Sequence, residues 1–183
     1  ILYIMDDNKI KDKINKLSKK SKYYEDLYDI FWKISEDIKI KKEHYDNISI
    51  GYLAGQYIGG HSKNIFIGYE AGKSSGTATD NSGENNIALG SSSLESVTEG
   101  DMNISVGEGA GKNLDTGRFN VFLGACAGCG NSSGKYNIAF GSNAGAVIAA
   151  MQFGTFIGHH AGCFRTAGEY SIAIGREALK GTS

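Results

Sequence analysis

One nine-residue pattern, repeated along about three quarters of the chain, restricts the fold more than any other feature. It reads Asn, apolar, any residue, apolar, Gly, two further residues, then Ala-Gly. Copies start at Asn47, Asn64, Asn86, Asn103, Asn120 and Asn137, and two weaker copies start at Gly154 and Ser171. Repetition at a fixed period predicts a solenoid in which each copy packs against its neighbours.

The central glycine of each copy sets the period. It falls at Gly51, Gly68, Gly90, Gly107, Gly124, Gly141, Gly158 and Gly175. All steps are 17 residues except one of 22, so the stretch between Gly72 and Asn86 carries a five-residue insertion. Insertions in solenoids project from one face and often bind partners.

The residues before each central glycine alternate with the two-residue period of a β-strand. We expect the apolar pair, such as Ile48 and Ile50, to face inward. Parallel stacking would place equivalent residues about 4.8 Å apart, and the asparagines would then form a hydrogen-bonded ladder. The sequence therefore predicts a mainly β fold, a parallel β-roll or β-helix solenoid of about eight 17-residue coils. A flattened roll with two short strands per turn is favoured over a three-sided coil.

The first 46 residues differ sharply from the rest. They hold 21 charged residues and no glycine, whereas all 26 glycines lie in 47–183. Because glycine disfavours helix, we predict helix only in the first part, over about 6–42. A heptad series supports it, with its second core position poor at first: Ile10, Leu17, Tyr24, Phe31, Ile38 and Tyr45. The seam leaves open a single amphipathic helix or a coiled coil of identical chains. We thus expect two domains, a helical stalk or docking segment at 1–46 and a β-roll shaft at 47–183.

The repeat resembles two known groups of proteins. One is the head of trimeric autotransporter adhesins, which is a parallel β-roll with a shorter repeat. The other, a closer match because Ala-Gly follows the central glycine so regularly, is a repeat of viral and bacteriophage tail fibres. The resemblance implies a homotrimer with a coiled coil beside the β region. The chain begins at Ile1 and stops after the eighth copy, so we expect a fragment of a longer fibre.

Composition argues against several other classes. A net charge of −1 argues against binding nucleic acid by bulk charge. No apolar run reaches the roughly 18 residues of a membrane span. Three cysteines do not make a disulfide scaffold. Cys126 and Cys129 form a CxxC, at most half of a zinc site, so we interpret them, with Cys163, as small apolar residues near corners.

Few side chains are candidates for chemistry. His159 and His160 are adjacent, and on a trimer axis histidines can ring a metal or an anion, although a solvated turn is the preferred interpretation. Tyr52, Tyr57 and Tyr69 cluster in the first two coils and are candidate contacts to a receptor or glycan, or a closure of the β region beneath the helix. Acids are scattered, and those closest in sequence are Glu95, Glu99 and Asp101. A glycosidase needs two carboxylates about 5 to 9.5 Å apart, so this alternative is retained.

These observations predict a structural fibre or adhesin segment, not an enzyme, with no metal and no cofactor. Its partners would be further copies of itself, virion or surface proteins through the helix, and a host receptor or glycan. The predicted location is a virion tail or surface fibre, with a bacterial cell surface as the alternative. Two other functions stay open: a polysaccharide-cleaving tailspike enzyme, and a virion assembly or spacer protein docked through its helix.

Overall fold

The computed structural model describes residues 46–57, 59–60, 62–74, 83–147, 150–163 and 170–181. The chain divides into two units at Lys41, and the described residues all belong to the second, Lys42–Ser183. The predicted helix over 6–42 and its coiled coil lie outside the described residues, as do His44 and His61. Most of the insertion between Gly72 and Asn86 lies outside them too.

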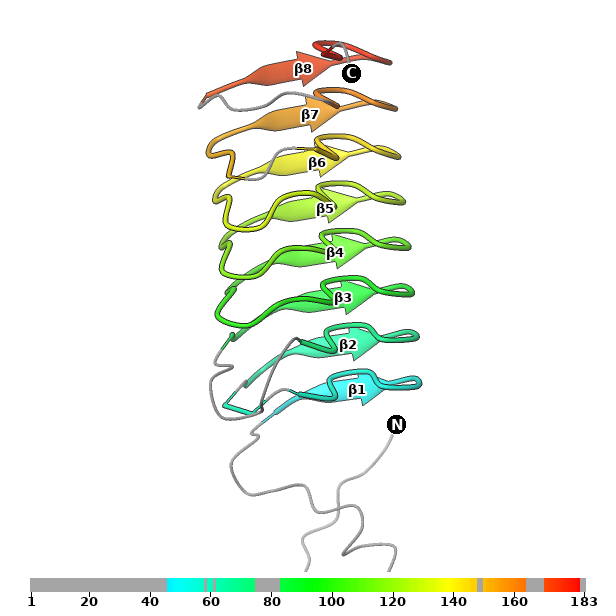
Figure 1. Cartoon of the computed structure of the whole chain (residues 1–183), viewed down its shortest axis with the longest axis vertical. Helices are drawn as coiled ribbons and strands as arrows, with labels where there is room; N and C mark the ends of the chain where they lie inside the picture. The colour runs from blue at the N-terminus through cyan, green and yellow to red at the C-terminus, as the bar shows by residue number, and fades with distance from the viewer. Residues whose placement is uncertain are drawn as a thin grey trace, which may run out of the picture. The chain divides into compact units, whose positions relative to one another are not determined.

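The second unit is a parallel β-solenoid of about six turns that carries eight strands in one sheet. The strands stack in sequence order, as Figure 1 shows from cyan β1 to red β8. Their bounds are β1 Ile48–Ile50, β2 Ile65–Ile67, β3 Ile87–Leu89, β4 Ile104–Val106, β5 Val121–Leu123, β6 Ile138–Phe140, β7 Thr155–Ile157 and β8 Ile172–Ile174. The predicted parallel solenoid is thereby confirmed, with one strand for each copy of the repeat.

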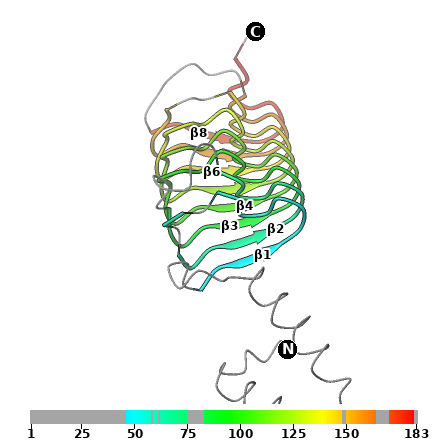
Figure 2. The same cartoon turned by 60° about the horizontal axis from the view of Figure 1, so that its bottom comes forward.

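The repeat fixes the strand register. Ile48 pairs with Ile65, and Ile65 pairs with Ile87 although 22 residues separate them. The insertion is therefore absorbed between strands and leaves the sheet unchanged. In Figure 2 the loops that join successive strands follow one another around the solenoid.

Glycine at the end of each strand is required by both conformation and space. Gly124 has φ of 129°, a region closed to other residues, and a Cβ there would lie 2.7 Å from the carbonyl carbon of Gly141. The same contact recurs from coil to coil, and Gly175 in the last described strand alone among this series has no neighbour within 4 Å. The central glycine thus lets successive coils approach at the spacing of a sheet.

The predicted direction of the strand side chains is wrong. The middle residue of each strand points inward: Phe66, Phe122 and Phe156 are 0 to 2% exposed. The apolar pair that flanks each of them points outward, and Ile50 is 59% exposed. A 17-residue coil encloses a narrow interior, because buried Ala-Gly segments such as Ala127-Gly128 line the opposite wall. It admits one strand side chain per coil, and two large ones do not fit.

Candidate functional site

The outward side of the sheet is the most unusual surface of the described chain. It carries two columns of side chains, the first and third residue of every strand, and all are apolar except Thr155. Those exposed by more than a third are Ile48, Ile50, Ile67, Ile104, Ile138, Phe140, Ile157, Ile172 and Ile174. We call this surface the outer face.

The area of the outer face is large for a monomer. A fully exposed Val, Leu, Ile or Phe side chain has roughly 60 to 120 Å² to lose on burial. The fifteen apolar side chains of the outer face, about half exposed, therefore present on the order of 500 to 900 Å². Monomeric soluble proteins seldom expose apolar patches above a few hundred Å², and larger patches mark interaction sites.

A ladder of aromatic rings borders the outer face. Phe119, Tyr136, Phe153 and Tyr170 stack on one another with ring centroids 5.0, 5.1 and 4.9 Å apart and planes within 3°. Each stands two residues before the first outward residue of its strand, so at most about 7 Å of chain separates the ladder from the outer face. The stacked rings cover each other's planes and show mainly their edges.

The position occupied by the aromatic ladder changes character along the solenoid. In the first three coils it holds exposed polar residues, Asp46, Lys63 and Asn85. From the fourth coil on it holds Met102 and then the four aromatic residues, which are 40 to 72% exposed. The outer face is thus bordered by polar groups at the β1 end and by apolar groups at the β8 end.

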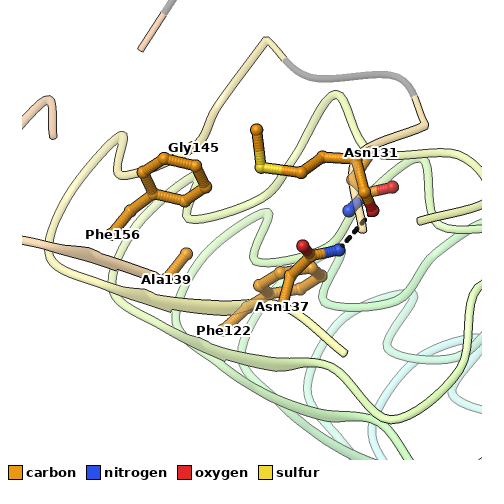
Figure 3. Close-up of a pocket in the computed structure, with 7 residues that line it drawn as sticks. Phe122, Asn131, Asn137, Ala139, Gly145 and Phe156 are labelled. Atoms are coloured by element: carbon orange, nitrogen blue, oxygen red, sulfur yellow. Dashed lines mark hydrogen bonds between the residues drawn. The ribbon is translucent and has the colours of Figure 1, made fainter. Parts of the chain in front are cut away.

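The interior of the solenoid offers no room for a ligand in the part surrounding the largest void described. This cavity, shown in Figure 3, has a volume of about 10 Å³ and is lined by Phe122, Asn131, Asn137, Ala139, Gly145, Met151 and Phe156. That volume suits one water molecule, whereas ligand pockets measure about 300 to 1,000 Å³. The cavity is a packing gap and not a binding site.

The six asparagines of the repeat form a ladder inside the solenoid. The Oδ1 of Asn103 accepts from the backbone N–H of Asn120 at 3.0 Å and from its Nδ2 at 3.0 Å. The Nδ2 of Asn120 also donates to the carbonyl of Gly134 at 2.8 Å. The ladder closes at Asn137, whose Oδ1 accepts the N–H of Gly154. These side chains are buried and satisfied, apart from half-buried Asn47 at the open end, so they hold the coils together.

The candidate contact residues fall into two separate places. Tyr52 and Tyr69 stack with centroids 5.5 Å apart and are 67% and 52% exposed, while Tyr57 is half-buried farther along its coil. His159 and His160 lie five strands further on, with ring centroids 4.1 Å apart. The structure therefore brings the tyrosines and the histidines together in no common site.

The histidine pair is shaped by its neighbours. Partial burial, and then the charges of His159 and Lys180, lower the pKa of His160 below its usual value. Its buried Nδ1 has no hydrogen-bond partner in the described chain. Across the described ranges no cluster of three His, Cys, Asp or Glu side chains is placed to hold a metal ion.

The prediction for the CxxC is wrong in part. Cys126 and Cys129 are half-buried and form a disulfide within one turn of the fifth coil, with their Cα atoms 4.8 Å apart. Cys163, at the equivalent position two coils on, is a buried free thiol, as expected of a small apolar residue. The spacing of three residues would have allowed this bond, but an odd cysteine count directed the interpretation away from it.

The candidate acids are mostly engaged in ion pairs between neighbouring coils. Glu95 lies 3.3 Å from Lys112, and Asp101 lies 3.2 Å from Arg118. Thr98 donates a hydrogen bond to Asp115 one coil on. These contacts tie the acids to neighbouring coils and give them a structural role.

The comparisons with known proteins leave these surfaces as the only guide to function. No protein-family model matches the chain, and neither a curated protein nor a solved structure is significantly similar to it. Among the helices of the described residues, none is long and apolar enough to cross a membrane.

Proposed function

We propose that the chain is a structural segment of a virion fibre or surface adhesin, in which three copies form a rigid shaft. The outer face carries this proposal, because an apolar surface over all eight strands is stable in water only when another chain covers it. Its area is close to the roughly 800 Å² per partner of a standard interface. The continuous ladders of backbone and asparagine hydrogen bonds suit a stiff rod.

The first test is the native mass in solution. We expect three times the 19.5 kDa of one chain, unchanged over at least a hundredfold dilution. Native mass spectrometry and light scattering measure it directly. A 19.5 kDa species at every concentration would show that one chain is stable alone and would reject the shaft of several copies.

Location separates the proposed virion or cell-surface fibre from its rivals. Peptides of the chain in purified particles, or at the bacterial surface, would support a fibre in that place. If a protein lacking 1–46 still enters particles, the helical segment is not the docking element and the spacer function loses its support.

The enzymatic alternative has less support from the described residues. A glycoside hydrolase uses a pair of carboxylates that face a sugar, whereas Glu95 and Asp101 are paired with Lys112 and Arg118. Incubation with capsular and host polysaccharides, followed by measurement of released reducing ends, tests this directly. Release by the intact chain that survives purification to homogeneity would restore the tailspike function.

A glycan-binding role has its best candidate in Tyr52. Its ring is exposed at the end of the Tyr52–Tyr69 stack, so one face remains free for a sugar. Tyr52→Ala should reduce binding on a glycan array if this ring is the contact. Unchanged binding in the variant would move any glycan site elsewhere.

A further inference from the structure

The outer face and the aromatic ladder together also specify how the copies would meet. We infer that identical chains pack on this surface in parallel, with equivalent coils at equal height. This inference rests on the proposed function, since it takes the partner to be a second copy of the chain. It adds the face, the direction and the register of the contact.

The repeat itself favours a second copy as the occupant. The side chains of the outer face recur at the sheet spacing of about 4.8 Å, and the rings of the ladder recur at 4.9 to 5.1 Å. A chain with the same rise can mesh coil by coil over all eight strands. A partner with another repeat would lose register within a few coils and leave gaps in the contact.

The polar and aromatic ends of the ladder position set the direction. In an antiparallel arrangement coil 1 faces coil 8 and coil 2 faces coil 7, which brings Asp46 opposite Tyr170 and Lys63 opposite Phe153. Such contacts would bury charged groups against rings, and an unpaired buried charge is costly. In a parallel arrangement rings meet rings, and the polar residues share a region that can stay hydrated.

The same change in character fixes the register. The boundary between polar and apolar residues falls between Asn85 and Met102, one coil apart. A slip by one coil would place these two side chains at the same height and would leave one coil of apolar surface uncovered at each end. Only the unshifted alignment covers the five apolar ladder residues completely.

Cross-linking of two matched cysteine variants tests the direction. Ile67→Cys and Ile157→Cys stand in the same column of the outer face, five strands apart, and both native side chains are 37% exposed. The two variants are co-assembled in the full-length chain, treated with a short bis-maleimide without reducing agent, and mapped by peptide mass spectrometry. The unmodified chain, with buried Cys163 and the Cys126–Cys129 disulfide, is the control.

The cross-linked peptides give opposite results for the two directions. We expect 67–67 and 157–157 links and no 67–157 link. Predominant 67–157 links would overturn the parallel arrangement. Absence of all three links in a chain whose mass is still a multiple of 19.5 kDa would overturn the outer face as the interface, while the proposed shaft would stand.

A charge placed on the outer face tests the face independently. Phe140→Lys should weaken association at least about a hundredfold, because the 53% exposed ring would be replaced by an ammonium group that must be desolvated. Asn113→Lys, at an exposed position outside the outer face, is the matched control and should leave the mass unchanged. Circular dichroism confirms that both variants are folded. Equal masses for the two variants would overturn the inference, and a monomeric unmodified chain would reject the proposed function with it.

Discussion

At the scale of single residues, each coil fills its narrow interior with one large side chain from either of two positions. Phe66, Phe122 and Phe156 lie over glycines 72, 128 and 162, and a Cβ on any of these glycines would come within 2.5 Å of the ring. In coil 3 the sizes are reversed: Ala88 faces Leu94, which is fully buried at a φ of 49°. Coil 6 has Ala139 and Gly145 at these positions, and the cavity lies there.

Exchange of the two sizes in coil 3 should reveal this compensation. Ala88→Phe alone overpacks the coil at a cost of about 1 to 3 kcal/mol. Leu94→Gly alone leaves a cavity worth about 2 to 5 kcal/mol, less about 1 kcal/mol for the strain released at a left-handed position. The double variant copies coil 2, so it should lose less than the sum by at least about 1 kcal/mol.

Urea unfolding of the four proteins of this cycle measures the coupling free energy. Strictly additive losses would contradict the compensation between the two positions, because independent sites show no coupling.

His160 should give the fold a pH dependence of defined sign. Its pKa is lowered in the folded chain, chiefly by partial burial and next by His159, with Lys180 and Arg176 acting in the same sense and Glu177 against. The stability it contributes is therefore present above its unfolded pKa of about 6.5 and is lost as the pH falls through its folded value. The free energy of unfolding should fall between pH 7 and pH 5.

His160→Asn isolates this contribution. It copies Asn143, which occupies the equivalent left-handed position one coil earlier with a φ of 56°. The fall in stability between pH 7 and pH 5 should be smaller in the variant than in the parent chain. An identical pH profile would show that other groups cause the dependence.

At the scale of structural elements, the asparagine ladder links the coils more firmly in the middle than at its end. Asn120 donates to Asn103 and Gly134, and accepts from Asn137. Asn120→Ala would leave several buried groups unpaired, so we expect a loss of at least about 3 kcal/mol in the free energy of unfolding.

The control is half-buried Asn47 at the open end, whose Oδ1 accepts the N–H of Asn64 at 2.8 Å. Asn47→Ala should cost about 1 kcal/mol. Denaturant unfolding compares the two, and a similar loss in both variants would show that the ladder carries no more load in its interior.

At the scale of the whole solenoid, stability should decline from the middle strands toward both ends. Every strand from β2 to β7 is hydrogen-bonded on two sides, whereas β1 and β8 have a strand partner on one side only. Repeat proteins open from their ends, since their stability is a sum of neighbouring interfaces.

Amide hydrogen exchange should therefore be slowest in β4 and β5 and fastest in β1 and β8. Exchange at one uniform rate along the sheet would indicate that the solenoid opens only as a single unit.

The sequence by itself determined the period, the parallel stacking and the register, because a glycine and an asparagine that recur every 17 residues have few other ways to satisfy their backbone. It also identified the asparagine ladder. Its two-residue alternation defined two faces of each strand, but alternation alone is symmetric and does not say which face is buried. The choice belongs to the tertiary structure.

That choice was decided by the space inside a closed coil. The Ala-Gly wall leaves room for one side chain per strand, so Phe66 and Phe122 turn inward and the isoleucines turn out. The aromatic ladder and the outer face follow from it, and neither is visible in the order of residues, since both depend on which coils touch. Packing in three dimensions thus created the surface on which the proposed function rests.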